Sequence, residues 1–246
     1  MKYKLLLLLM VVSNFSFSQN ADEIVKNADD KLRGKSSYSE ITININRPKW
    51  SKEMKMKDWS KGSDYSVSVI TSPAKEKGTV FLMREKEVWN YLPTIERTVK
   101  FPPSMMLQNW MGTDLTNDDL VKQSSLVTDY DKKIIGEEEK EGYTCWKIEL
   151  TPKPNAAVVW GKIIIWIDEK EYMQMQTDFY DEDMFLVNQM IGSDVKTFDS
   201  KLLPSKLTVV PVDKPGQSTV ISYSQWKFGI DIPDEYFTTN YMKRIH

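Results

Sequence analysis

Hydrophobic residues recur at every second position through most of the chain, which is the spacing of strands that bury one face. Ile41, Ile43 and Ile45 are separated by polar residues, and Met54 and Met56 lie between lysines. This alternation predicts β-strands rather than helices. Predicted strands cover 38–45, 54–56, 65–69, 79–84, 88–92, 97–101, 130–138, 143–151, 161–167, 172–180, 185–196, 205–212 and 219–227.

Short turns join these predicted strands. The gaps contain residues that favour turns, such as Lys77-Gly78 and Lys214-Pro215-Gly216. Outside residues 102–125, no gap has room for the helical crossover of about 12 residues that parallel neighbours need. The sheet is therefore expected to be mostly antiparallel, and the fold class to be mainly β.

One helix is predicted ahead of the strands, over residues 21–33. Its apolar residues follow the helical period and form one stripe. Asn20 is the expected N-cap, and Gly34 follows the last turn in the usual C′ position. The stripe consists of Ile24, Val25, Ala28 and Leu32.

Residues 102–125 interrupt the strand pattern. Ser104 is a candidate cap for a single helical turn, and Thr116 with Asp119 resembles a capping box in which Asp replaces Glu. Two short helices are therefore expected here. If the sheet curls into a barrel or half-barrel, they should pack in its mouth or on its concave face.

The chain begins with the pattern of a cleaved signal peptide. Lys2 and Lys4 precede an uncharged apolar run of about 8 residues, and Ser16 and Ser18 follow it in a small-x-small triplet. Cleavage is expected before Gln19. The run is well short of the roughly 20 residues that span a bilayer. No cysteine lies near the cleavage point, so the exported protein is expected to be soluble and not lipid-anchored.

The remaining residues, 19–246, are expected to form one domain. They contain no internal repeat and no linker rich in Pro, Gly or Ser. All-β folds commonly use roughly 200–250 residues as one unit. We expect a monomer that consists of a signal peptide, residues 1–18, and a single β domain.

Charge and composition exclude several classes of function. The formal net charge of −2 gives no basic surplus for nucleic acid. Cys145 is the only cysteine, so no intramolecular disulfide can form, and its strand-like surroundings predict a buried, inert thiol. The single histidine, His246, is the last residue, which argues against catalysis by Ser-His-Asp, Cys-His or zinc centres. No cofactor is expected.

Two clusters of carboxylates leave a weaker alternative open. Residues 181–183 lie in a predicted hairpin turn, and residues 137–139 lie near a strand end beside Lys140. Solvated charge is expected at both places. An enzyme that uses carboxylates alone would require two of them to converge in one cleft.

The chain is rich in large adaptable side chains, with 13 methionines and 8 tryptophans. Methionine is flexible and polarisable, and adaptable binding surfaces use it heavily. Any single one of these residues is expected to fill the core. The set as a whole favours a residual apolar groove on a curved sheet.

Several short motifs resemble one family. The run Val88-Trp89-Asn90-Tyr91-Leu92-Pro93, the pair Glu96-Arg97, and the segments Met111-Gly112-Thr113-Asp114-Leu115 and Asp118-Asp119-Leu120 occur in this order. The chain is similar in these motifs to the outer membrane lipoprotein-sorting proteins, a LolA-like family. It departs from the family pattern at Thr113, where Ser is usual, at Leu115, where an aromatic is usual, and at Glu96, where a basic pair is common.

The resemblance implies an unclosed β-barrel of about eleven strands wrapped around short helices that form a lid over an apolar cavity. It also implies a periplasmic carrier of acyl chains, from lipoproteins or other lipids, that passes them toward the outer membrane. The donor would be an inner-membrane transporter and the acceptor an outer-membrane protein. Gly112 and Asp114 would shape the turn. Cargo is expected to contact Met54, Met56, Trp89, Tyr91, Met105, Met106, Trp110 and Met111.

A second alternative is a non-catalytic scaffold or protein-binding module of the cell envelope. Its concave face would be filled by its own side chains, and its partners would bind at the rim. The size of the cavity distinguishes this alternative from a carrier.

Overall fold

In the computed structural model, the described residues are 20–245 except 86, 122–124, 155 and 157. They form a single antiparallel sheet of 13 strands. The strands are β1 (Ser36–Arg47), β2 (Trp50–Lys61), β3 (Tyr65–Ser72), β4 (Val80–Arg84), β5 (Glu87–Leu92), β6 (Arg97–Lys100), β7 (Tyr130–Lys140), β8 (Tyr143–Pro152), β9 (Lys162–Asp168), β10 (Gln174–Tyr180), β11 (Leu186–Phe198), β12 (Lys201–Pro211) and β13 (Ser218–Phe228).

The sheet curves strongly but does not close. Its strand order is β6-β5-β4-β3-β2-β1-β13-β12-β11-β10-β9-β8-β7, so β6 and β7 are the two edges. The first strand pairs with the last, because β1 lies antiparallel to β13. The prediction of a mainly β, unclosed antiparallel fold is confirmed. The resemblance implied about eleven strands, and this number is wrong because the sheet has 13. Each run of alternating residues predicted as a strand does form one.

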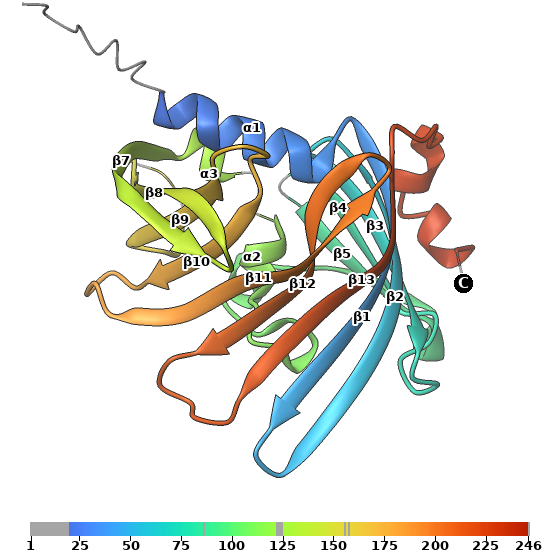
Figure 1. Ribbon diagram of the computed structural model, residues 1–246. Coiled ribbons are helices and arrows are strands. Elements are labelled where there is room, and N and C mark those ends of the chain that lie inside the picture. The colour runs from blue at the N-terminus through green and yellow to red at the C-terminus, as the bar shows by residue number, and fades with distance from the viewer. Residues whose placement is uncertain (1–19, 86, 122–124, 155, 157, 246) are drawn as a thin grey trace, which may run out of the picture.

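Helix α1 (Ala21–Arg33) runs across the opening of the curved sheet (Figure 1). Asn20 caps it, since its Oδ1 accepts a hydrogen bond from the backbone N–H of Asp22 at 3.0 Å. Gly34 ends it at a φ of 64°, a conformation that side chains disfavour, and its N–H donates to the carbonyl of Asp30. Both predicted ends of the helix are confirmed.

The segment between β6 and β7 forms short helical turns on the concave side of the sheet. They are η2 (Pro103–Met105), η3 (Trp110–Gly112), α2 (Asn117–Val121) and α3 (Ser125–Thr128). Ser104 lies inside the single turn η2 rather than capping it. The predicted capping box at α2 is confirmed, because Thr116 N–H donates to Asp119 Oδ2 at 2.7 Å and Asp119 N–H donates to Thr116 Oγ1 at 3.1 Å.

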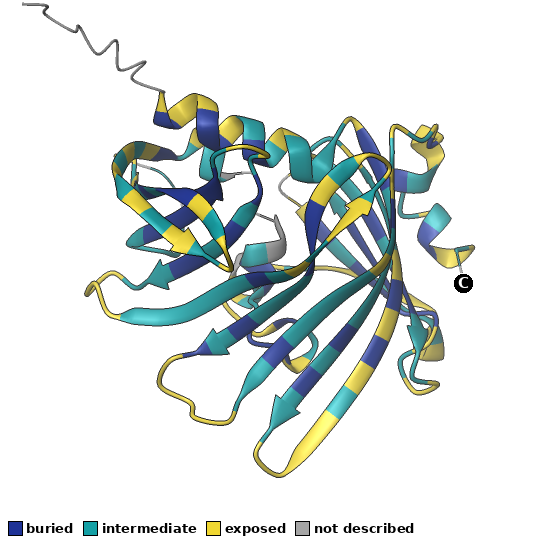
Figure 2. Ribbon diagram, in the orientation of Figure 1, coloured by how far each residue is buried: buried dark blue, intermediate teal, exposed yellow. Residues whose placement is uncertain are grey.

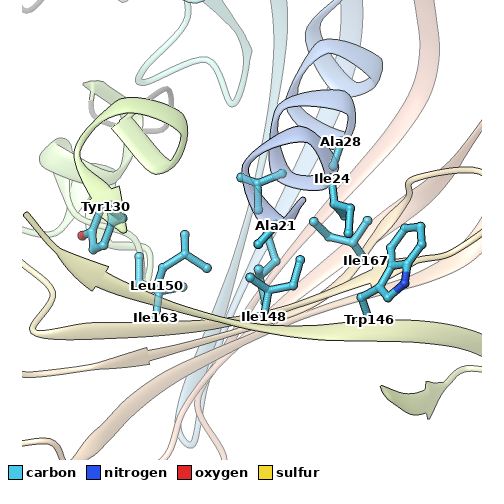
Figure 3. Close-up of a cluster of buried hydrophobic side chains, with 11 residues drawn as sticks. Ala21, Ile24, Ala28, Tyr130, Trp146, Ile148, Leu150, Ile163 and Ile167 are labelled. Atoms are coloured by element: carbon cyan, nitrogen blue, oxygen red, sulfur yellow. The ribbon is translucent and has the colours of Figure 1, made fainter. Parts of the chain in front are cut away.

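The apolar stripe of α1 packs on one end of the sheet. Figure 3 shows Ala21, Ile24 and Ala28 above side chains of β8 and β9, among them Ile148 and Ile167. Along the strands, buried positions alternate with more exposed ones (Figure 2). Most strands bury one face, as the period-two pattern predicted, whereas β9 is buried on both faces and β6 on neither. The buried faces provide the apolar area that stabilises the sheet.

The chain after β13 covers the outer face of β3–β5 (Figure 1). It contains η4 (Asp234–Phe237) and η5 (Tyr241–Lys243), and a further short turn, η1 (Pro93–Ile95), follows β5. Ile232, Phe237 and Met242 pack there against Val67 and Leu82. The outer face of this part of the sheet is therefore a second buried layer rather than a wet surface.

Two predictions fall on parts of the chain that are not described. The signal peptide, residues 1–18, and His246 lie outside the described residues. Within the described part of the chain, no helix combines the length and apolar character needed to cross a bilayer.

Candidate functional site

The concave face of the sheet encloses a cavity of about 280 Å³. Strands from both halves of the sheet contribute to its wall, and α1, α2, α3 and η3 contribute residues above them. The alternation within the strands places the same set of side chains toward this space and the neighbouring set away from it. The cavity is thus a direct product of the curvature of the sheet and the helices over its opening.

One part of the cavity is apolar. Cross-strand pairing aligns Ile41 of β1 with Met56 of β2, and Ile43 with Ile221 of β13. Trp110 of η3 lies over them and contacts the ring of Phe81 edge-on, with 5.4 Å between ring centroids. The apolar wall consists of Ile41, Ile43, Met56, Phe81, Trp110, Met190, Leu207 and Ile221.

The other part is polar, and its residues also form cross-strand rows. Ser39 of β1 pairs with Asp58 of β2, which pairs with Ser68 of β3. The next row contains Ser37 and Ser60, whose hydroxyls are 2.7 Å apart. All of these residues line the cavity. A polar end therefore adjoins an apolar end along the same three strands.

Asp58 and Tyr223 lie close together in the polar end. Burial raises the pKa of Asp58 from 3.8 to about 6, although the hydrogen bond from the Ser68 hydroxyl acts in the opposite direction. Burial also raises the pKa of Tyr223, and the nearby Asp58 carboxylate raises it further. Low solvation thus disfavours charge on both groups.

Arg33, at the last turn of α1, brings a cation to the same place. Its Nε donates to Asp29 Oδ1 at 2.8 Å, and its charge acts on Tyr223. Burial raises the pKa of Asp29 despite the guanidinium beside it. The Nη2 atom of Arg33 is buried without a hydrogen-bond partner among the described residues.

The turn after η3 is fastened to the sheet by Asp114. The hydroxyl of Thr219 donates to Asp114 Oδ2 at 2.6 Å, and Arg47 Nη1 lies 3.1 Å from the same oxygen. Arg47 Nη2 also donates to the carbonyl of Gly112 at 2.8 Å. This buried network links the turn to β1 and β13. It explains why the turn carries an aspartate that does not line the cavity.

Helix α2 is fastened separately. The indole N–H of Trp160 donates to Asp119 Oδ1 at 3.0 Å, and Asn117 Nδ2 donates to the carbonyl of Met105 at 2.8 Å. The backbone N–H of Asp118 donates to the carbonyl of Met106 at 2.8 Å. These contacts join residues 105–119, the cover of the cavity, into one unit.

Solved structures similar to this one cover almost the whole chain. A DUF1329 family protein from Desulfovibrio piger superposes with a TM-score of 0.83 at 26% sequence identity, covering 90% of this chain and 97% of that one. A domain from Vibrio parahaemolyticus, described as an outer membrane lipoprotein-sorting protein, gives a TM-score of 0.79 at 20% identity, covering 91% and 98%. A LolA superfamily protein from Nitrosomonas europaea gives 0.75 at 22% identity, covering 90% and 98%.

A family model described only as an uncharacterized protein matches residues 62–244, well over half of the chain. The chain belongs to this family, and its fold is LolA-like. No curated protein sequence matches it. The family resemblance stated from the motifs is thus confirmed, together with the LolA-like fold.

The cavity brings together only some of the residues expected to contact cargo. Met56 and Trp110 line it. Met54 lies fully buried beside them in the same apolar cluster, and Met111 packs against that cluster. Met105 and Met106 are half-buried in the cover and do not line the cavity.

Trp89 and Tyr91 lie on the opposite face of the sheet from the cavity. Tyr91 belongs to the cluster with the C-terminal residues, and Trp89 packs against that cluster. The guanidinium of Arg84 lies 5.6 Å from the Trp89 ring. Val88, which lines the cavity, precedes Trp89 directly, so the period of two already implies that Trp89 and Tyr91 point outward.

The residues that line the polar end of the cavity were not expected from the sequence. Serines at alternate positions of β1 and β3, with Asp58 between lysine and tryptophan in β2, were the available signal. Their convergence depends on the pairing register of distant strands. No local pattern contains that register.

Proposed function

We propose that the protein is a periplasmic carrier that binds the acyl chain of a lipid or lipoprotein in this cavity and passes it toward the outer membrane. One observation carries the proposal. A continuous apolar wall, which includes Ile41, Met56 and Ile221, lies inside the molecule beneath α1 and η3. A scaffold with a filled core would not need this space.

The size of the cavity supports a small cargo. Its volume of about 280 Å³ lies near the lower end of ligand pockets, which span roughly 300–1,000 Å³. Each buried methylene contributes about 0.8 kcal/mol, so half of a sixteen-carbon chain contributes roughly 6 kcal/mol before ordering costs. This is sufficient for reversible binding of one chain and release to a partner with a better apolar site.

The route of the carrier rests on the N-terminal residues. We propose that residues 1–18 are a signal peptide and that residues 19–246 work as one soluble, monomeric domain in the periplasm. The donor would be an inner-membrane transporter, and the acceptor an outer-membrane protein.

We also propose that the carrier performs no covalent chemistry. Carboxylates do reach the cavity wall, yet structural contacts engage them. Asp29 pairs with Arg33, Asp58 accepts from Ser68, and Asp119 caps α2 and accepts from Trp160. Among the described residues, no group of three His, Cys, Asp or Glu side chains could hold a metal ion.

Filling the cavity tests the function directly. Ile221 faces the cavity, and Val220 beside it on β13 faces the other way. Ile221→Trp is expected to weaken binding of a fluorescent apolar probe by at least about tenfold, whereas Val220→Trp should leave binding nearly unchanged. Circular dichroism and thermal melting of both variants check the fold. Equal probe affinity for a folded Ile221→Trp variant and the original protein would contradict the proposal.

A further inference from the structure

The polar end of the cavity contains groups whose hydrogen-bonding capacity is not used within the protein. No described residue donates to or accepts from the phenol of Tyr223 through an observed hydrogen bond, and Arg33 Nη2 is buried without a partner. Asp58 accepts a hydrogen bond from Ser68, but a carboxylate has room for several donors. A buried donor without a partner, such as Arg33 Nη2, is costly, and a polar ligand group in the cavity would complete it.

The three groups converge on one place. Asp58 of β2, Arg33 of α1 and Tyr223 of β13 all line the cavity, and the charges of Asp58 and Arg33 act on the phenol of Tyr223. Tyr223 pairs with Ile41, one row from Ser39 and Asp58. They line the cavity together with Ser39. The apolar wall continues directly from this place, since Ile41 and Met56 occupy the next row along β1 and β2. A molecule with a polar head and an apolar tail matches this order.

The charges of the polar end restrict the head group. In the polar end, Arg33 pairs with Asp29, and Asp58 is the remaining carboxylate, with a pKa of about 6 that keeps it mostly ionised at neutral pH. A carboxylate or phosphate head would be repelled by Asp58 and would bring it no proton. An ammonium head would bring protons but no acceptor for Tyr223 and Arg33.

A hydroxyl group satisfies all three. It has one proton to donate and two lone pairs to accept hydrogen bonds, and it carries no charge. We propose that the polar end holds the uncharged, hydroxyl-bearing head of an amphiphile, whose hydroxyl donates to Asp58 and accepts from Tyr223 and Arg33, while its tail lies along Ile41, Met56 and Ile221. The inference rests on the proposed carrier function and names its substrate class.

Three amphiphiles with one common tail test the head-group preference. Dodecanol, dodecanoate and dodecylamine compete with a fluorescent apolar probe at about pH 7.5, where a carboxyl with a pKa near 6 is mostly ionised. Dodecanol is expected to bind at least about tenfold more tightly than the other two. Preference for dodecanoate or dodecylamine, or equal affinity for all three, would overturn the inference.

Variants then identify the groups responsible. Tyr223→Phe removes only the phenol oxygen, and Asp58→Leu removes the acceptor while keeping the branched shape of the side chain. Each is expected to weaken dodecanol binding by about tenfold. Tyr223→Phe should leave dodecylamine binding unchanged, because an ammonium cannot accept from the phenol, and Asp58→Leu should leave dodecanoate binding no weaker, because it removes a like charge. Asp64→Asn removes an exposed carboxylate from the β2–β3 turn and should change nothing. Unchanged dodecanol affinity in a folded Tyr223→Phe variant and a folded Asp58→Leu variant would overturn the inference.

The two proposals fail in different ways. If none of the three amphiphiles displaces the probe from the original protein, the carrier function itself is wrong. If all three displace it with equal affinity, the cavity binds apolar chains without reading their heads. Equal displacement by all three amphiphiles would therefore contradict the hydroxyl-binding site but not the carrier function.

Discussion

Thr219 and Asp114 hydrogen-bond to each other in both directions. The Thr219 hydroxyl donates to the Asp114 carboxylate at 2.6 Å and accepts from the Asp114 backbone N–H at 2.9 Å. The two residues are far apart in the sequence, and both are buried. Together with Arg47, they join the cover of the cavity to the middle of the sheet, so the position of the cover depends on this small polar network.

Removing the carboxylate of Asp114 should loosen the cover. Asp114→Ala leaves the guanidinium of Arg47 without its buried partner, and loss of a buried charge partner costs roughly 3–5 kcal/mol. We expect a lower free energy of unfolding in urea and faster amide hydrogen exchange over residues 105–119. Asp213→Asn, in the exposed β12–β13 turn, is the control and should behave like the original protein. Identical exchange over 105–119 in Asp114→Ala would show that the network does not hold the cover.

The stability of the protein should depend on pH through Asp58. Its pKa is about 6 in the folded protein and 3.8 for an ordinary aspartate, so the folded protein binds the extra proton between these values. Stability should therefore fall as the pH rises from about 4 to about 6, by an amount on the order of 1–3 kcal/mol.

Asp58→Asn cannot ionise and should lack this slope. The variant is expected to be more stable than the original protein at neutral pH and equally stable at pH about 4, because a protonated aspartate resembles asparagine. Urea titrations across the pH range measure the difference. Parallel stability curves for the two proteins would show that Asp58 is not desolvated.

Trp110 should contribute far more to stability than an exposed tryptophan. It is buried against Phe81 and the methionines of β2, whereas Trp50 is 53% exposed. Trp110→Ala is expected to cost about 3–5 kcal/mol, and Trp50→Ala less than about 1 kcal/mol. Chemical denaturation of the matched pair gives both values. Similar costs at the two positions would mean that the cover does not pack as described.

Trp89 should be irrelevant to cargo. It packs on the outer face of β5 beside Arg84 and Lys100, away from the cavity. Trp89→Ala is expected to lower the free energy of unfolding but to keep the affinity for an acyl probe within about twofold. Val88→Trp, one residue earlier on the cavity side, should strongly lower the affinity for the probe. A large loss of affinity in Trp89→Ala would place part of the binding site on the outer face.

Features that depend on neighbouring residues could be predicted from the sequence. The ends of α1 follow from Asn20 and Gly34, and the capping box follows from Thr116 and Asp119. Buried Cys145 also follows from its strand, and burial raises its pKa to about 12. Each of these is decided by spacing along a single element.

Features that depend on distant residues could not. Trp89 was assigned to the cavity because the family motif says which residues occur, but not which face they occupy. The C-terminal layer that covers Tyr91 has no periodic signal of its own. The meeting of Asp58 with Tyr223 depends on strand order and on the bulge between Glu40 and Ile41, which alters the register of β1 against β13.

Native mass spectrometry of the protein purified from the cell envelope, in its original form and as Ile221→Trp, decides whether the cavity holds a lipid. We expect the original protein to carry one lipid with an apolar chain and a hydroxyl-bearing head, and Ile221→Trp to carry none. The original protein without any bound lipid, or the same lipid bound equally to both forms, would contradict this expectation.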